Sequence, residues 1–358
     1  MSTKRGKKQD RFIKKIGRVF GRFLIWFATT FIILVAGLFV FFYFVNKGPS
    51  PRIRDLFVAS AKESSVGGVL ADIYLSPEEI NSILSKNNTV EFNEITDTSL
   101  VKTNTSDNEI ADVVFADSVY ADVEIDPDGD GIDIFEVHGS TYKGKMMVVY
   151  DASRVKVATI SNYDYDLPGL TVNELVDKYD CVAGVNGGKY DDEIGMGTGG
   201  MPDGIVISEG VLRFGDPEMV YDVYGFTSDN VLVVGRMTAG YALSIGIRDA
   251  VSFGPTLIVN GKSASYSGSG SGLNPRTAIG QREDGAVLLL VIEGRQPSSL
   301  GATMGDIIQI MEEFGAVNAA NLDGGMSSSM VYNGQDVVSS CTLGSRKMPT
   351  AFVVERRE

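Results

Sequence analysis

The sequence predicts an α+β protein with mixed β-sheets and a few flanking helices, preceded by one N-terminal transmembrane helix. An uncharged apolar run occupies residues 23–45. Many short strand-like segments follow residue 133, separated by turn residues. A strand, helix and strand pattern over residues 286–322 predicts a crossover that brings two strand ends to one edge of a sheet and supplies at least one parallel pairing.

The apolar run at 23–45 is long enough for a helix to cross a hydrocarbon core of about 30 Å. Nine Lys and Arg residues precede it, so the positive-inside rule places the N-terminus in the cytoplasm and everything after Asn46 outside. A cleaved signal peptide is the alternative, but its apolar region would be shorter and no small-x-small site follows Val45. We therefore expect a single-pass protein of the cell membrane with four parts: a basic cytoplasmic tail (1–22), a transmembrane helix (23–45), a membrane-proximal stalk or subdomain (46–132) and the main domain (133–358).

The composition restricts the chemistry that this domain can use. Residues 23–358 carry a formal charge of −22, which excludes binding of nucleic acid through the general field of the protein. Cys181 and Cys341 are too few for a disulfide framework, and the Cys and His content is too low for a tetrahedral zinc site. The single histidine, His138, is read as a strand residue. Carboxylates and arginines must therefore carry any catalysis.

Local patterns predict the helices and strands of the main domain. Ser76, Thr171 and Thr303 each cap a helix, the first running to about Ser85, the second to about Lys178 and the third through Phe314. A polar stretch at 87–110 without periodicity is interpreted as a mobile loop or a poorly ordered connection. Strands are predicted at 145–150, 155–160, 181–185, 220–226, 230–235, 241–247, 257–260, 286–292 and 316–322.

Three acidic or glycine-rich segments have compositions that can serve ligand sites or active-site loops. Residues 126–133 match the first half of a calcium loop, but Asp133 and Val137 stand where an apolar residue and a bidentate Glu are needed, so an acidic turn is favoured. No cofactor is predicted, while Ca²⁺ or Mg²⁺ held by carboxylates stays an open alternative. Residues 195–200 lack the lysine of a P-loop. Residues 263–272 are almost wholly Ser and Gly and form either a lid or a plain surface loop.

Charged residues gather at strand ends between residues 276 and 325. Arg276 directly precedes a strand predicted from Thr277, the next strand ends in Glu293 and Arg295, and a third ends in Asp323. The crossover predicts that Glu293 and Asp323 lie close together. Arginine forks bind two phosphate oxygens at once, and paired carboxylates are the usual tools of glycoside cleavage. An Arg–carboxylate network that only ties the turns together is the structural alternative.

Four motifs in order give the chain a recognisable pattern. They are Asn186-Gly187-Gly188-x-Tyr190, Arg276-Thr277-Ala278-Ile279-Gly280, Glu293-Gly294-Arg295-Gln296, and Asn321-Leu322-Asp323-Gly324-Gly325 with Ser327-Ser328. Over about residues 135–355 the sequence resembles the phosphodiester glycosidase family, with Glu293 at the position where that family usually has Asp. The resemblance implies hydrolysis of a sugar 1-phosphodiester.

The resemblance also suggests roles for individual residues. We expect Asp323 to be the base or nucleophile and Glu293 its partner. Substrate-binding residues are expected to be Arg276 and Arg295 as a phosphate clamp, Asn186 as a ligand of a sugar hydroxyl, and Gly187, Gly324, Gly325, Ser327 and Ser328. The predicted protein is a membrane-anchored, extracytoplasmic hydrolase acting on a sugar-phosphate or glycan in cell-envelope or exopolysaccharide metabolism. The alternative is a non-catalytic protein that binds or helps to assemble envelope polysaccharide.

Overall fold

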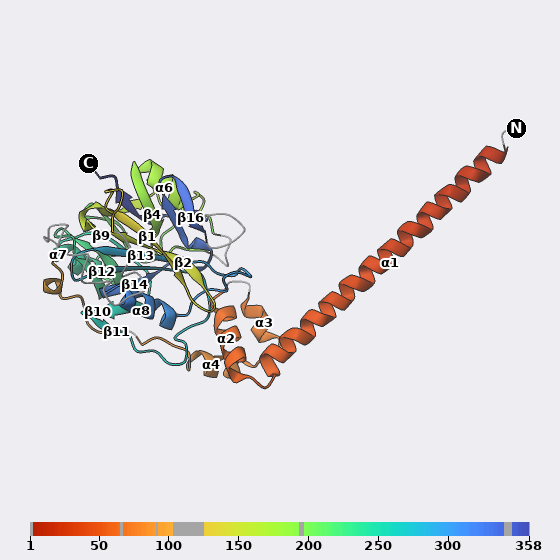
Figure 1. Cartoon of the computed structure of the whole chain (residues 1–358), viewed down its shortest axis with the longest axis horizontal. Helices are drawn as coiled ribbons and strands as arrows, with labels where there is room; N and C mark the ends of the chain where they lie inside the picture. The colour runs from red at the N-terminus through yellow and green to blue at the C-terminus, as the bar shows by residue number, and fades with distance from the viewer. Residues whose placement is uncertain are drawn as a thin grey trace.

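The chain folds into a β-rich body that three short helices join to one long N-terminal helix (Figure 1). The computed structural model describes residues 3–64, 67–90, 92–102, 125–192, 197–339 and 346–357. The predicted α+β class, with sheets, a few flanking helices and an apolar helix before them, is confirmed.

Helix α1 (Thr3–Lys47) runs without a break through the basic tail and the apolar stretch. Its part from Lys15 to Lys47 has a mean hydropathy of 2.5 and is the one described helix that is long and apolar enough to cross a membrane. Large apolar side chains such as Trp26 and Phe31 are exposed along it, as is typical of a helix that crosses a membrane. The orientation predicted from the basic residues stays a prediction.

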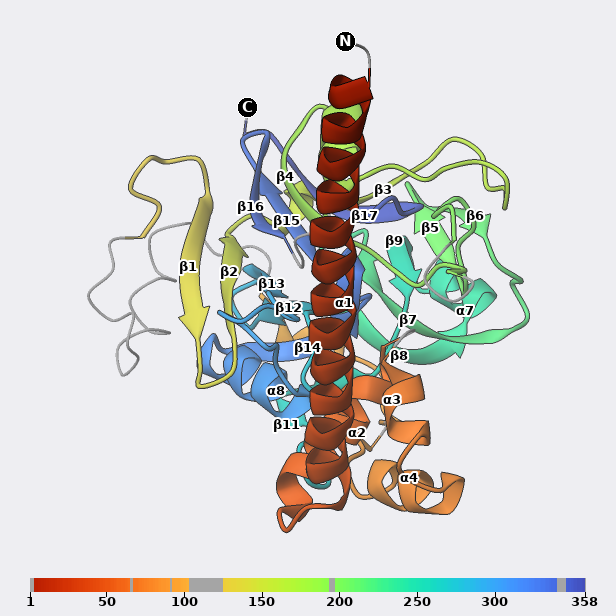
Figure 2. The same ribbon diagram turned by 90° about the vertical axis from the view of Figure 1, so that its right-hand side faces the viewer.

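Three short helices gather at the C-terminal end of α1 in both views (Figures 1 and 2). They are α2 (Pro51–Lys62), α3 (Gly68–Asp72) and α4 (Pro77–Leu84). Their buried apolar residues form a small core of their own, made of Val58, Ala71, Leu75, Ile80 and Ile83. The predicted capping box of α4 is present, with Ser76 and Glu79 bonding each other's backbone N–H groups.

The segment after α4 packs on the body, so the interpretation of residues 87–110 as a mobile connection is wrong for its described part. Thr89 pairs with Tyr266 in an isolated bridge. Buried Thr96 bonds Val234 and Asn318, which anchors the segment to strands far away in the sequence. Residues 103–110 lie outside the described residues. Tertiary hydrogen bonds order this polar segment where local periodicity gave no sign of order.

Three antiparallel sheets make up the body, in strand orders β1-β2-β13-β12-β14-β10-β11, β16-β15-β4-β17-β3 and β6-β5-β9-β7-β8. The first sheet contains β1 (Ile132–His138), β2 (Lys143–Val149), β10 (Thr256–Val259), β11 (Lys262–Ser263), β12 (Arg276–Arg282), β13 (Val287–Ile292) and β14 (Ala316–Leu322). The second contains β3 (Val155–Thr159), β4 (Cys181–Asn186), β15 (Ser329–Tyr332), β16 (Gln335–Ser339) and β17 (Thr350–Glu355). The third contains β5 (Val206–Ser208), β6 (Val211–Phe214), β7 (Val220–Thr227), β8 (Leu232–Thr238) and β9 (Ile247–Ser252).

The centre of the first sheet positions the charged strand ends. Strands β13 and β14 run in the same direction, joined by helix α8 (Met304–Glu313), but β12 lies between them and pairs antiparallel with both. The predicted parallel pairing of this crossover is therefore wrong. Because Arg276 pairs with Ile292 and Thr277 with Leu322, the start of β12 and the ends of β13 and β14 still meet at one edge.

The main core lies between the sheets and under the helices. Side chains of all three sheets, among them Val185, Phe226, Leu289 and Phe352, share one buried cluster. Apolar residues of α8, including Ile307 and Met311, form a second cluster with the other face of the first sheet. Thr303 caps α8 as predicted, and Gly315, in a left-handed conformation, follows the C-cap Phe314.

Two further predictions concern residues 171–178 and 241–247. Helix α6 (Val172–Lys178) begins with the predicted Thr171 capping box. The strand predicted at 241–247 is wrong, because Thr238 caps a short helix, α7 (Ala239–Ser244), before β9 begins. The single apolar run was compatible with either structure, and the Thr238 cap decides for the helix. His138 ends β1, as predicted.

Candidate active site

A cleft of about 610 Å³ opens at the edge where β12 begins and β14 ends. Its lining joins this edge to the membrane-proximal segment and to the turn after β4. The charged side chains that line it are Glu63, Asp192, Asp222, Arg276, Arg295, Asp323 and Arg346. Three guanidinium groups and four carboxyl groups therefore face one space, which suits an anionic ligand that also needs acid–base chemistry.

Asp323 lies directly after β14, where a short turn holds its carboxyl group. The Gly324 N–H donates to Asp323 Oδ1 at 2.9 Å. Burial is the largest influence on this group and raises its pKa to about 6, against smaller opposing effects of Ser327 and the Gly324 N–H. A carboxyl group with a pKa near neutrality is able to hold or release a proton at working pH.

The turn after Asp323 shapes the floor of the cleft. Gly324 and Gly325 line it, and Gly325 adopts a left-handed conformation, with φ +60°, that favours glycine. Ser327 also lines the cleft and shares a 3.0 Å hydrogen bond with the hydroxyl of Tyr190. Ser328 is fully buried, and it is not among the described lining residues. The glycines and Ser327 are thus placed to touch a ligand, whereas Ser328 is not.

Arg276 is buried at the start of β12, and its guanidinium group is already engaged. Its Nη2 donates to Glu63 Oε2 at 2.5 Å, and to Ser271 Oγ and the Gly272 carbonyl at 3.0 Å each. Glu63 also accepts from Asn274 Nδ2 at 2.7 Å. The carboxylate of Glu63 therefore binds the same kind of donors that would hold a phosphate oxygen.

Arg295 and Arg346 approach the cleft from other loops. Arg295 is exposed, has a φ of +56°, and donates to Asn274 Oδ1 at 3.0 Å. Arg346 forms a bidentate pair with Asp192, with Nη1 donating to Oδ2 at 2.7 Å, and its guanidinium lies over the Tyr190 ring. The sequence motifs pointed to Arg295, but Asp192 and Glu63 were missed because no local pattern marks them.

Asn186 lies behind the cleft rather than in it. Its side chain is fully buried, and its Nδ2 donates to the Asp323 carbonyl at 2.6 Å. Its Oδ1 accepts from Thr277 Oγ1 at 2.7 Å and from the Ser329 N–H at 3.1 Å. Neighbouring Gly187 accepts from the Asp323 N–H at 3.3 Å and is also absent from the described lining. Asn186 thus bonds the backbone of Asp323 and is not among the described residues that line the cleft, so its predicted contact with a sugar hydroxyl stays a prediction.

Glu293 does not meet Asp323 in the cleft. Its carboxylate pairs with Lys143 at 3.1 Å, and its backbone carbonyl accepts from Ser299 Oγ. It is not among the described residues that line the cleft, since β12 separates its strand from β14. The geometry therefore does not favour Glu293 as the partner of Asp323. Asp192 is the carboxylate that raises the Asp323 pKa, although burial contributes more.

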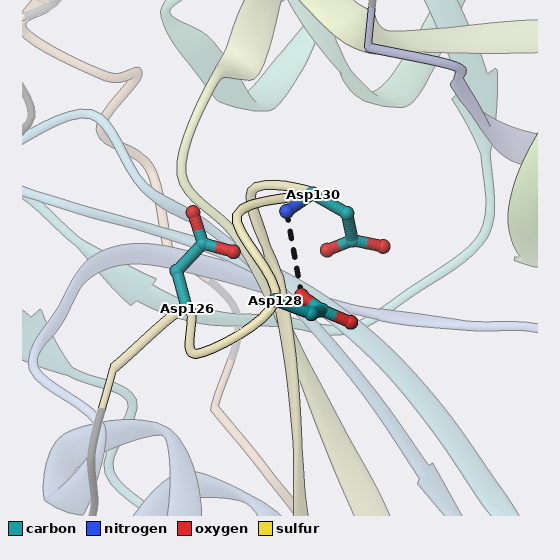
Figure 3. A group of neighbouring side chains, drawn as sticks. All are labelled: Asp126, Asp128 and Asp130. Atoms are coloured by element: carbon teal, nitrogen blue, oxygen red, sulfur yellow. Dashed lines mark hydrogen bonds between the residues drawn. The ribbon is translucent and has the colours of Figure 1, made fainter.

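None of residues 126–133 is among the described residues that line the cleft. Figure 3 shows three aspartates of this acidic loop gathered at one turn. Asp126, Asp128 and Asp130 have carboxylate oxygens within 4.8 Å of one another. Protein donors already occupy several of these oxygens: the Gly131 N–H bonds Asp126, and the Tyr332 hydroxyl donates to Asp130 at 2.6 Å. These contacts fit the predicted acidic turn.

Comparisons with known proteins agree with the sequence motifs. Residues 179–355 match the family model described as phosphodiester glycosidase. The SPbeta prophage-derived uncharacterized protein YomE of Bacillus subtilis (strain 168) is 32% identical over 156 residues, which are 39% of this chain and 23% of that protein. This chain thus spans less than a quarter of the length of that curated relative.

Two solved structures were also compared. The zebrafish N-acetylglucosamine-1-phosphodiester α-N-acetylglucosaminidase catalytic domain, auto-inhibited by its pro-peptide, has a TM-score of 0.50 at 20% identity, over 63% of this chain and 82% of that one. A hypothetical protein from Synechocystis has a TM-score of 0.43 at 18% identity, over 63% and 62%. The zebrafish likeness supports the fold, and residues 179–355 of this chain match the phosphodiester glycosidase family in sequence.

Proposed function

We propose that this protein is a membrane-anchored hydrolase that cleaves a sugar 1-phosphodiester on the extracytoplasmic side, in cell-envelope or exopolysaccharide metabolism. The observation that carries the proposal is Asp323, a carboxyl group with a pKa of about 6 in a cleft that three arginines also line. The arginines supply charge for a phosphate, and Asp323 supplies the proton chemistry.

The reaction needs one bond to form at the sugar C1 and one to break. Water activated by Asp323, or the Asp323 carboxylate itself, attacks C1 while the C1–O bond to phosphate breaks. If the carboxylate attacks, water then hydrolyses the glycosyl ester and releases the sugar. The electron pair leaves with the phosphate, which departs as a monoester of the remaining alcohol. Because that leaving group is already stabilised, binding its charge matters more than protonating it. Arg276, Arg295 and Arg346 line the cleft at which this charge would develop.

Glu63 competes with the substrate for Arg276 in this proposal. Its carboxylate takes the Arg276 Nη2, the Asn274 amide and the Gly272 N–H, so a phosphate needs it to turn away. Glu63 sits at the end of α2 with about a third of its side chain exposed, which leaves it room to rotate. The zebrafish catalytic domain is auto-inhibited by a pro-peptide. In this chain, the support for an inhibitory role of the α2 end is the contact between Glu63 and Arg276.

The test uses the full chain in detergent with methyl N-acetyl-α-glucosaminyl phosphate as substrate and released reducing sugar as readout. Asp323→Asn is expected to lower kcat by about 10²- to 10⁴-fold. Asp336→Asn, an exposed carboxylate on β16, is the matched control and should keep wild-type turnover. Glu293→Gln separates the two carboxylate assignments: a loss as large as that of Asp323→Asn would restore Glu293 as a catalytic partner.

A wild-type protein that binds the phosphodiester but releases no sugar would overturn the proposal. That result would support the non-catalytic alternative, in which the cleft only binds envelope polysaccharide. Isothermal titration with the same methyl phosphodiester, run beside the turnover assay, measures binding independently of cleavage.

A further inference from the structure

Helices α2 and α3 lie alongside the outer end of the apolar helix α1. Phe57 of α2 packs against Phe42 of α1, with ring centroids 5.4 Å apart. The Tyr74 hydroxyl donates to the Phe39 carbonyl at 3.0 Å. Phe39 is six residues before Val45, the last residue of the apolar run, so at 1.5 Å per residue Tyr74 reaches about 9 Å inside the outer end of that run.

An ion pair lies at the end of α1 that would face water. Lys47, the last residue of α1, pairs with Glu79 of α4 at 2.9 Å. Contacts with α1 thus pass from an ion pair at Lys47 to aromatic packing at Phe42 and then to Tyr74 at Phe39. This order matches the change from water through headgroups to acyl chains at a bilayer surface.

Three large apolar side chains, on α2, on α3 and directly after α3, are exposed in the described structure. Ile53 is 58% exposed, Val69 62% and Ile73 50%. We call them the α2–α3 apolar patch. Ile73 adjoins Tyr74, whose hydrogen bond places it at the level of the apolar run. Interfacial helices bury their apolar face about 5–10 Å into the headgroup and acyl boundary, which is the depth that Tyr74 reaches.

The other end of α2 is fastened to the candidate active site. Ser60 Oγ accepts from the Leu273 N–H at 2.8 Å, and Glu63 contacts Arg276 and the Gly272 N–H. Only six residues separate Phe57, which touches α1, from Glu63, so about 9 Å of helix joins the span to the arginine. The Arg276 side of the cleft is therefore joined to the contact with α1 through one short helix.

We propose that α2 and α3 rest in the membrane interface through the α2–α3 apolar patch, and that the cleft takes a sugar 1-phosphodiester whose alcohol is a membrane lipid. This inference rests on the proposed function. Water adds at C1 of the sugar, the C1–O bond breaks with its electron pair going to phosphate, and the lipid keeps a phosphate monoester. A lipid-borne diester presents its phosphate at the height of the cleft, and confinement to the membrane raises its effective concentration there.

The experiment uses the full chain reconstituted in phosphatidylcholine and phosphatidylglycerol vesicles. Two probes share the same N-acetyl-α-glucosaminyl phosphate group and differ in the alcohol, which is methyl in one and hexadecyl in the other. The wild-type protein is expected to cleave the hexadecyl probe with a kcat/KM at least about tenfold higher than the methyl probe. Equal values for the two probes would overturn the lipid assignment.

Patch variants then connect that preference to the helices. Ile53→Asn, Val69→Asn and Ile73→Asn combined should lower kcat/KM for the hexadecyl probe about tenfold while leaving the methyl probe within about twofold. The matched control replaces three exposed apolar side chains elsewhere on the body, Val211, Val220 and Tyr241, by Asn. An equal loss on both probes, or an equal loss in the control, would refute the role of the patch.

A measurement without catalysis tests the contact itself. Ile73→Cys and Val220→Cys variants carry an environment-sensitive fluorophore, and a quencher attached to lipid acyl chains is added to the vesicles. Strong quenching at residue 73 alone is expected. Equal quenching at both positions refutes the interfacial contact. If the label at residue 73 is quenched but neither probe is cleaved, the membrane contact stands and the proposed hydrolase function fails, together with the substrate assignment.

Discussion

Replacing Asp323 by Asn should stabilise the protein at alkaline pH and leave its stability unchanged at acid pH. The pKa of Asp323 is raised from an ordinary 3.8 to about 6, chiefly by burial. A carboxyl group whose pKa is higher in the folded state than in the unfolded state favours folding only while it is protonated. The loss of folding free energy caused by the ionised Asp323 is therefore absent below the unfolded-state pKa, develops between pH 4 and 6, and is complete above the folded-state pKa.

The magnitude follows from the size of the shift. A shift of about two pKa units, at 1.36 kcal/mol each, corresponds to about 3 kcal/mol of folding free energy at pH 8. For a domain of this size each kcal/mol moves Tm by about 2–4 °C. Asp323→Asn should thus raise the Tm of the detergent-solubilised chain by about 6–12 °C at pH 8, and by almost nothing near pH 4.

Thermal unfolding of both proteins, followed by circular dichroism across pH 4 to 8, measures this difference. The Asp336→Asn variant controls for removal of one negative charge, because that carboxylate is exposed. Turnover assays of the wild-type protein over the same pH range should show kcat/KM rising with pH to a plateau above about pH 6, since a base or nucleophile acts in its ionised form. A Tm difference that is equal at pH 4 and pH 8, or activity that falls above pH 6, would refute the reasoning.

Three further substitutions test the surroundings of Asp323. Glu63→Gln removes the carboxylate charge that pairs with Arg276, and should lower KM for the methyl phosphodiester about tenfold with kcat almost unchanged, because one charge-assisted hydrogen bond contributes roughly 1.5 kcal/mol or more. An unchanged KM in steady-state assays would contradict the competition between Glu63 and the phosphate for Arg276. Asn186→Ala removes a buried amide that bonds the Asp323 backbone, so we expect a loss of about 2–3 kcal/mol in unfolding free energy together with lower kcat; an unaltered Tm would contradict the positioning role. Arg346→Lys loses the bidentate geometry and should lower kcat/KM about tenfold, whereas wild-type kinetics would show that a point charge suffices at that position.

Local chemistry in the sequence predicted much of the fold. The apolar run at 287–292 forms the buried central strand β13, and the Thr303 capping box begins α8 as predicted. These features depend on neighbours within a few residues, so they are visible in the sequence. The strand predicted at 241–247 is wrong because so short an apolar run fits the period of a strand and of a helix, and the Thr238 cap that favours a helix lies before it.

The candidate site depended on contacts that span much longer distances in the chain. Arg276 and Asp323 were predicted, and the structure brings them to one edge, but the sheet order that separates Glu293 from Asp323 has no local signature. Glu63 reaches Arg276 across 213 residues, so no spacing rule could reveal it. The sequence motif correctly placed Asn186 near Asp323. Its full burial and its hydrogen bond to the Asp323 carbonyl depend on tertiary packing, so the sequence did not reveal them.

Because β12 lies between β13 and β14, the charged residues of the candidate site are carried by separate loops. Asp323 depends on the end of β14 and on Asn186 behind it, whereas Arg295 lies in the connection from β13 to α8. Under the proposed function, lengthening that connection would alter the approach of the phosphate without shifting the backbone that carries the Asp323 carboxyl group. In such a domain substrate preference is able to diverge by loop change while the chemistry is inherited intact.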